Sequence, residues 1–270
     1  HWDPAQFLRL CVDERITHTI LAPTLIIDLL RHVDEHPAAL DQWQAAPVQA
    51  VWYAASPIPV AVARQVETTL GPVFNQMYGL TELLGNSNSM TCTQLTSTWH
   101  GRKPETAGRV QLNNAVRVVN ENGADVSTGD IGEIAVRAHN AAGYWKNPDE
   151  TAKTIVDGWV HTGDMGHLDD DGFLTIVDRK KDMIISGGLN IYPVEIENVL
   201  HEHPAVQQCA VIGVSDPRWV ETPCAVVVRK DGATVQADEL VEFVRERIAH
   251  FKVPKHVVFA DELPVSATGK

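Results

Sequence analysis

Cysteine is scarce and scattered in this sequence. Four cysteines occur among 270 residues, at Cys11, Cys92, Cys209 and Cys224, and none belongs to a CxxC pair. Such spacing fits neither a zinc site nor a disulfide framework, so a reducing, cytoplasmic location is expected.

Long apolar runs are also lacking. The most apolar stretch, residues 19–30, is interrupted by Pro23 and Asp28 and follows no signal-peptide pattern. It is shorter than the roughly 20 residues that a membrane helix needs. We therefore expect no integral membrane segment.

Positive charge is in deficit. The chain has 22 Lys and Arg against 35 Asp and Glu, a formal charge of −13, which disfavours nucleic acid and anionic membranes as partners. An apolar content of 44% is typical of a globular protein. The length suits one large or two ordinary domains.

The order of apolar patterns predicts an α/β fold. Up to about residue 84, helical patterns alternate with short apolar runs, as in helices that cover a mostly parallel sheet. The helical patterns span residues 4–14, 23–33 and 59–70, and the apolar runs span residues 19–21, 48–53 and 73–77.

The patterns change twice further along the chain. Residues 108–177 predict strands separated by turn residues, a β-rich subdomain. After residue 178, helices at 193–203 and 237–250 interleave with strands at 206–214 and 224–229, which predicts a small α+β domain. We expect a large domain over residues 1–178 and a small one over residues 179–270.

Several short segments place reactive side chains at element ends. Thr81 and Glu82 follow Tyr78-Gly79 at the end of an expected strand, where they suit a phosphate and its Mg²⁺, or equally a plain helix cap. Asp164, expected in a turn, suits paired ribose hydroxyls or is a plain turn residue.

Two further segments also have both a functional and a structural interpretation. Gly187 and Gly188 after an apolar run allow a ligand to approach the backbone, or form a tight turn. Lys270, which follows a glycine, and Arg179 at the expected domain junction suit a developing negative charge, or are solvated surface.

Taken together, these segments resemble the motifs of one family. The matching segments, in order, are Tyr78 to Glu82, Thr162 to Asp164, Asp178 to Gly188 with Asn190, and Pro264 to Lys270. They are similar to the motifs of the adenylate-forming, AMP-binding superfamily, and more narrowly of its acyl- and aryl-CoA synthetases. Four motifs in the same order make a specific signal.

The resemblance implies an acid–thiol ligase. In such enzymes a carboxylate attacks the α-phosphate of ATP to give an acyl-adenylate and pyrophosphate, and the thiol of coenzyme A then displaces AMP. The implied cofactors are ATP, Mg²⁺ and coenzyme A, with a fatty-acid or aryl carboxylate as substrate. A homo-oligomer is compatible with the resemblance.

The resemblance also implies roles for residues around the nucleotide. Lys270 would bridge the carboxylate and the α-phosphate, Thr81 would bind that phosphate, and Glu82 would hold Mg²⁺. Asp164 and Arg179 would take the ribose hydroxyls. The remaining nucleotide-binding residues would be Ala54, Ala55 and Ser56 against one face of the adenine, Tyr78 with Gly79 on the other, and Asn190 from the small domain.

A second set of roles concerns the thiol. Lys181 matches the hinge about which the small domain rotates between the two reactions. That rotation would withdraw Lys270 and bring Gly187 and Gly188 to the pantetheine arm. Trp219 and Phe251 would stack on the adenine of coenzyme A, with core aromatics as the alternative.

The sequence departs from the family pattern in two respects. Val220 stands before Glu221 where the family usually has glycine. The phosphate-gripping loop that precedes these motifs in the family is not found, so the resemblance covers the carboxyl-terminal half of the family's chain. We expect both ends to be cut, and these 270 residues alone to bind ATP weakly without turnover.

Three other functions compete with this interpretation. His32 to His36 matches the H-x-x-E-H metalloprotease pattern, although Pro37 would end that helix and no third acidic ligand is evident. A second possibility keeps adenylation but transfers the acyl group to a carrier-protein phosphopantetheine. The third is a non-catalytic nucleotide-binding fragment. The carboxylate itself is left open, since only the apolar segment after Glu82 bears on it.

Overall fold

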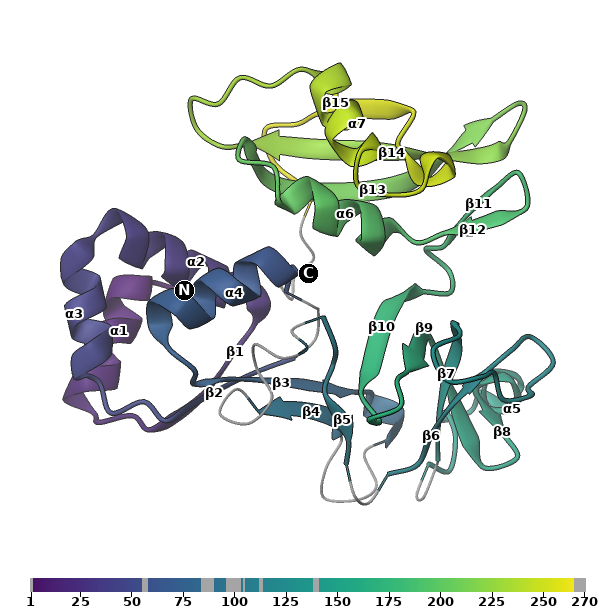
Figure 1. Cartoon of the computed structure of the whole chain (residues 1–270). Coiled ribbons are helices and arrows are strands. Elements are labelled where there is room, and N and C mark those ends of the chain that lie inside the picture. The colour runs from purple at the N-terminus through teal and green to yellow at the C-terminus, as the bar shows by residue number, and fades with distance from the viewer. Residues whose placement is uncertain are drawn as a thin grey trace. The chain divides into compact units, whose positions relative to one another are not determined.

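The computed structural model of the chain describes residues 2–54, 58–83, 90–95, 103, 105–111, 114–137 and 141–264, with the backbone alone at 90–95 (Figure 1). The chain divides into two compact units. Unit 1 takes the residues up to Thr162 together with Gly166–Ile176. Unit 2 takes Gly163–Met165 and the residues that follow from Val177.

The first part of unit 1 is a sheet with helices. Its elements are α1 (Pro4–Asp13), β1 (His18–Leu21), α2 (Pro23–Glu35), α3 (Pro37–Ala45), β2 (Ala50–Tyr53), α4 (Val60–Leu70), β3 (Phe74–Gly79), a 3₁₀ turn (Thr81–Leu83), β4 (Met90–Leu95) and β5 (Arg109–Val110). Strands β1, β2 and β3 are parallel neighbours. Strands β4 and β5 extend the sheet in antiparallel fashion, so the expected α/β architecture is confirmed with a mixed sheet.

Proline residues start the first three helices of the sheet region. Each of these helices has proline in its first turn, where the missing N–H costs no hydrogen bond. The sequence pattern did not predict α3, because Pro37 ends α2 and also begins the next helix. Trp43 of α3 is buried in the core, and its indole N–H donates to the carbonyl of Leu70 at 2.7 Å.

The second part of unit 1 is the expected β-rich region. It comprises β6 (Val116–Val119), β7 (Gly132–Arg137), α5 (Pro148–Thr154), β8 (Ile155–Val156), β9 (Trp159–Leu168) and β10 (Leu174–Arg179), in the order β10-β9-β7-β6 with β8 paired to β9. The last residues of β10 belong to unit 2. Thr162 to Asp164 lie inside β9, so the turn expected there is wrong. Strand β9 lies between β10 and β7, and the Thr162 hydroxyl donates to the carbonyl of Ile134 on β7.

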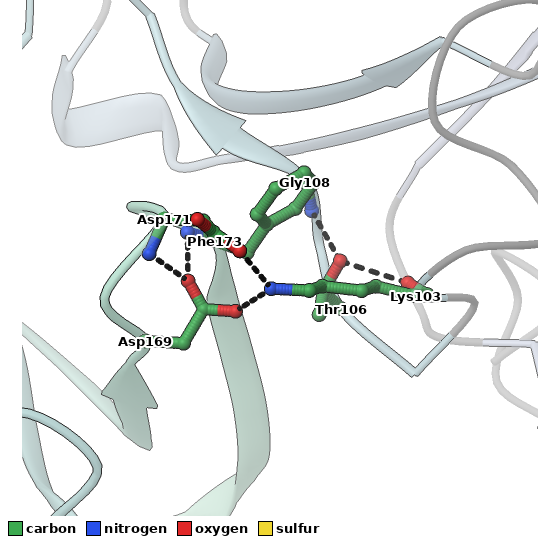
Figure 2. A network of polar contacts seen from close by, with 6 residues as sticks. All are labelled: Lys103, Thr106, Gly108, Asp169, Asp171 and Phe173. Atoms are coloured by element: carbon green, nitrogen blue, oxygen red, sulfur yellow. Dashed lines mark hydrogen bonds and ion pairs between the residues drawn. The ribbon is translucent and has the colours of Figure 1, made fainter.

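A lysine ties the segment before β5 to the turn between β9 and β10, as Figure 2 shows. The Lys103 ammonium lies 2.5 Å from Asp169 Oδ2, 2.8 Å from Asp171 Oδ2 and 4.6 Å from the centre of the Phe173 ring. Asp169 Oδ1 accepts the backbone N–H groups of Asp171 and Phe173, which closes the turn. The network thereby holds the two sheets of unit 1 together at this edge.

Unit 2 is a five-stranded sheet with helices. Its elements are β11 (Ile184–Ser186), β12 (Leu189–Ile191), α6 (Pro193–His201), β13 (Val206–Asp216), β14 (Val220–Arg229), α7 (Ala237–Arg245), a 3₁₀ turn (His250–Lys252) and β15 (His256–Phe259). The order is β12-β11-β14-β13, with β15 parallel to β14. Helices α6 and α7 pack on the sheet through a common core (Figure 1).

The small domain was predicted in outline rather than in detail. Two strands and two helices were expected, and three further short strands join them. Helix α7 ends at Arg245, five residues before the expected end at His250. Across the described residues, no helix is both long and apolar enough to traverse a bilayer.

Glu197 on α6 is a buried acid that closes the edge of this sheet. Its Oε1 accepts a hydrogen bond from the backbone N–H of Val211 on the edge strand β13, at 2.8 Å. Burial raises the pKa of Glu197 to about 7; the bond from Val211 opposes this rise, and the charge of Asp178 adds to it.

We expect this acid to make unit 2 less stable as pH rises. Because the folded-state pKa lies above the unfolded value, folding takes up a proton between pH 4.5 and about 7, which favours the folded state at low pH. The shift corresponds to at most ~3 kcal/mol. Glu197→Gln keeps the acceptor oxygen but cannot take up the proton. The free energy of unfolding, measured with urea at pH 5 and at pH 8, should therefore lose most of its dependence on pH in this variant.

Exposed Glu202, one residue beyond α6, provides the matched control. Glu202→Gln should leave the difference in unfolding free energy between the two pH values as it is in the parent chain. Equal pH dependence in the Glu197→Gln variant and the parent would contradict the assignment.

Candidate active site

The first group of candidate residues lies where β2 and β3 end in unit 1. Ala54 follows β2, Tyr78 and Gly79 end β3, and Thr81 and Glu82 begin the 3₁₀ turn that follows. Because β2 and β3 are parallel neighbours, these ends meet at one edge of the sheet. Such an edge is the usual ligand site of an α/β sheet.

Packing holds this edge in place from the side of the β-rich region. Tyr78 and Leu83 pack against the core cluster formed by Ala107, Ile134, Val136 and Leu174. The segment that carries Thr81 and Glu82 is therefore fixed at both of its ends. Ala55, Ser56 and Lys270 lie outside the described residues.

Tyr144 is a site residue that sequence reasoning missed. Its hydroxyl donates to Glu82 Oε1 at 2.8 Å, although the two residues are 62 positions apart. The hydrogen bond to Glu82 raises the pKa of Tyr144, and partial burial adds to the rise, so the phenol is protonated at neutral pH. No local pattern in the sequence links these two residues.

The arrangement around Glu82 fits a divalent cation. Among the described residues Tyr144 is the partner of the half-buried Glu82 carboxylate, which leaves Oε2 for a ligand. Mg²⁺ prefers oxygen ligands and commonly binds one or two carboxylates together with substrate phosphates. Glu82 and the adjacent Thr81 hydroxyl supply oxygens of this kind.

The second group of candidates belongs to unit 2. Arg179 Nε lies 3.3 Å from Asp164 Oδ1, and the Asp164 side chain is only 8% exposed whereas that of Arg179 is half exposed. The N–H of Lys180 donates to the carbonyl of Gly163 at 2.8 Å, which joins the two segments beside the ion pair. The structure thus brings together the two residues expected at the ribose.

Asp178 attaches this pair to the rest of unit 2. Its Oδ1 accepts the N–H of Arg179 at 2.7 Å, and its Oδ2 accepts the N–H of Val194 in the first turn of α6 at 3.2 Å. Tyr192 at the N-cap of α6 makes no side-chain capping bond, so Asp178 serves that helix end. Burial raises the pKa of Asp178. Lys181 is exposed in the turn that follows, and Asn190 is exposed on β12.

The third group surrounds the hairpin between β11 and β12. Gly187 has φ +58°, and its N–H donates to the carbonyl of Trp219 at 2.9 Å. A Cβ on Gly187 would lie 2.7 Å from the Trp219 ring, so only glycine permits this approach.

Trp219 and Phe251 lie at the surface of unit 2, which excludes the alternative of core aromatics. Their exposed fractions are 36% and 45%. Two cations lie over the Trp219 ring, with Arg218 at 4.6 Å and Lys255 at 5.4 Å from its centre. A ring flanked by cations suits a base that carries phosphates.

The H-x-x-E-H segment forms the end of a helix. Helix α2 stops at Glu35, and the His36 Nδ1 lies 3.0 Å from the His32 carbonyl. The two imidazole rings stack 4.5 Å apart. Within the described ranges, no cluster of three His, Cys, Asp or Glu side chains could hold a metal ion.

Comparison with known proteins identifies the family. The family model for the AMP-binding enzyme matches residues 1–145, and that for the AMP-binding enzyme C-terminal domain matches residues 195–270. The chain belongs to the AMP-binding enzyme family. The predicted membership is confirmed.

Curated relatives of this family member are CoA ligases. The chain is 40% identical to the medium/long-chain-fatty-acid–CoA ligase FadD8 of Mycobacterium tuberculosis, over 100% of its own length and 47% of that protein's. It is 39% identical to a feruloyl-CoA synthase of Amycolatopsis, over 100% of its length and 53% of the relative's. The chain spans about half the length of the curated relatives it matches.

Solved structures of related enzymes share the fold. The amide bond synthetase McbA from Marinactinospora thermotolerans matches with a TM-score of 0.91 at 32% identity, over 100% of this chain and 53% of that one. ATP-bound MatB from Rhodopseudomonas palustris matches with a TM-score of 0.88 at 32% identity, over 99% of this chain and 51% of that one.

Val220 is a strained residue in unit 2. It has φ +72°, which is an outlier for a β-branched side chain, and its side chain is 74% exposed. We expect Val220→Gly to raise the free energy of unfolding by about 1 kcal/mol, because strain is relieved and little burial is lost. Chemical denaturation measures this, with Val220→Ala expected to give a smaller gain. If Val220→Gly lowered the free energy of unfolding, the conclusion that Val220 is strained would be wrong.

Gly187 and Gly188 form a matched pair for testing the approach of Trp219. Both have positive φ, but a Cβ on Gly188 meets no atom within 4 Å. Gly188→Ala should cost about 1 kcal/mol of stability through the backbone alone. Gly187→Ala should cost clearly more and shift the tryptophan emission, since the Trp219 ring must move. Equal costs measured by denaturation would argue against a close contact.

Proposed function

We propose that the protein to which this sequence belongs is an AMP-forming acyl-CoA synthetase that activates a fatty-acid or aryl carboxylate. The observation that carries the proposal is the buried Asp164 carboxylate held 3.3 Å from Arg179, an acceptor suited to the two hydroxyls of a ribose. The likeness along the whole chain to fatty-acid and feruloyl CoA ligases supports the acid–thiol reaction.

In the first half-reaction a carboxylate oxygen attacks the α-phosphorus of ATP and pyrophosphate leaves. Two anions must approach each other, so neutralising and positioning charge is the main task. Bound Mg²⁺ would supply charge neutralisation at the phosphates. Glu82 would hold the cation, the Thr81 hydroxyl would bind the α-phosphate, and Lys270 would bridge the phosphate and the carboxylate.

The nucleotide contacts would come from two groups of residues. Ala54, Ala55 and Ser56 would line one face of the adenine, and Tyr78 with Gly79 the other, since a flat base needs flat walls. Asp164 and Arg179 would take the ribose hydroxyls, and the exposed amide of Asn190 would add a polar contact.

In the second half-reaction the sulfur of coenzyme A attacks the acyl carbon and AMP leaves. Lys181 would be the hinge between a domain over residues 1–178, whose β-rich part is about 108–177, and a mobile domain over 179–270. Gly187 and Gly188 would admit the pantetheine arm. Trp219 and Phe251, both exposed, would stack on the adenine.

Two other acyl acceptors compete with free coenzyme A, a carrier-protein thiol and an amine. The amine is suggested by the structural relative McbA, which is named an amide bond synthetase. The exposed, cation-flanked Trp219 favours coenzyme A, which carries both a base and phosphates. A panel of carboxylates graded in chain length and aromaticity, offered with each acceptor, identifies both substrates.

Lys270→Ala separates the two half-reactions. We expect pyrophosphate release from ATP and the carboxylate to fall by roughly 100-fold or more, because the positive charge acts in the adenylation transition state. Thioester formation from a supplied acyl-adenylate should stay within about twofold of the parent rate. Both rates are measured on the whole protein to which this sequence belongs.

The controls separate enzyme from binding module. A parent protein that binds ATP but releases no pyrophosphate with any carboxylate would refute the proposed activity. Equal loss of both steps in the Lys270→Ala variant would instead refute the assignment of this lysine to adenylation alone.

A further inference from the structure

We propose that Tyr144 is a positioning residue for Glu82: its hydroxyl holds one carboxylate oxygen so that the other faces the divalent cation. The inference rests on the proposed function, which gives Glu82 the metal. The central observation is the 2.8 Å hydrogen bond from the Tyr144 hydroxyl to Glu82 Oε1.

Hydrogen bonds within the surrounding segment hold the backbone of Tyr144 in place. The backbone N–H of Tyr144 donates to Thr151 Oγ1 at 2.8 Å, and the Thr151 hydroxyl donates to the carbonyl of Asn147 at 2.8 Å. Asn147 Oδ1 in turn accepts the N–H of Glu150 and caps α5. The backbone of Tyr144 is therefore fixed by the first turns of a helix rather than by Glu82.

Gly143 makes this closure possible. Its φ is +121°, and a Cβ there would overlap the methyl group of Thr151. Any other residue would push the backbone away from Thr151 and turn Tyr144 aside. The geometry of the segment thus determines where the phenol points.

The phenol has a single proton to donate, and the geometry directs that proton to Glu82 Oε1. Glu82 itself sits on a short 3₁₀ turn and is only half buried, so the phenol is what orients its carboxylate among the described residues.

Orientation of this kind is what a metal-binding carboxylate needs. A glutamate free to rotate loses side-chain freedom when it binds a cation, and a second residue that fixes it removes that loss. Partners of metal ligands typically change metal affinity by 10- to 100-fold when they are mutated. Tyr144 would be such a partner for Glu82.

Tyr144→Phe removes the hydroxyl and keeps the ring. Binding of Mn²⁺ to the protein–ATP complex, followed by the electron paramagnetic resonance of free Mn²⁺, should show a dissociation constant raised about 10-fold. The Mg²⁺ concentration for half-maximal pyrophosphate release should rise similarly. The rate at saturating Mg²⁺ should change by less than about threefold, because Tyr144 contacts Glu82 and not the reacting atoms.

Neighbouring residues provide the controls. Trp145→Phe changes the adjacent ring, which is 88% exposed, and should leave Mn²⁺ affinity unchanged. Thr151→Val removes the acceptor of the Tyr144 N–H and should weaken Mn²⁺ binding by a smaller factor. Thermal unfolding of each variant shows whether a change in metal affinity accompanies loss of fold, and Thr151→Val tests the same geometry if Tyr144→Phe is unstable.

Glu82→Gln separates failure of this inference from failure of the proposed function. If Glu82→Gln weakens Mn²⁺ binding and Tyr144→Phe does not, Glu82 is the metal carboxylate and the positioning role is refuted alone. Tighter Mn²⁺ binding in Tyr144→Phe also refutes it, since the phenol would then compete with the cation. If Glu82→Gln has no effect, both the inference and the assignment of the metal to Glu82 fail.

Discussion

Carboxylates that accept backbone N–H groups hold together the turns and edges on which this structure depends. Asp169 closes the turn between β9 and β10 in this way, Asp178 joins the end of β10 to the start of α6, and Glu197 covers the edge of β13. Backbone donors at turns and edges have no partner in a sheet or helix, and a carboxylate oxygen supplies one. Part of the chain's excess of acidic residues is thus used to complete its backbone hydrogen bonding.

The same device shapes the surface proposed for coenzyme A. Asp216 accepts the N–H groups of Arg218 and Trp219, and its other oxygen lies 3.1 Å from the Lys255 ammonium. These bonds help to hold the indole against Gly187 and close to Arg218 and Lys255. Val220 follows in a left-handed conformation, so the local strain lies beside Trp219.

Local pattern in the sequence predicted much of the fold. Helices α1, α2, α4 and α6 and strands β1, β3 and β13 lie within a few residues of their expected ranges. The prediction differs from the structure at α3 and at β9. Pro37 both ends α2 and begins α3. The Gly163 segment has turn composition but runs on as part of β9, and its carbonyl accepts the N–H of Lys180.

The sequence by itself determined the family and the motif residues, because a motif is a local pattern that survives without its surroundings. The motifs predicted Asp164 and Arg179 in one ribose site, and in the structure these two residues form an ion pair. Only the tertiary structure decided that Tyr144 meets Glu82 and that the Trp219 ring lies on Gly187. Those contacts join residues far apart in the chain, and the packing of whole elements, which no short pattern encodes, brings them together.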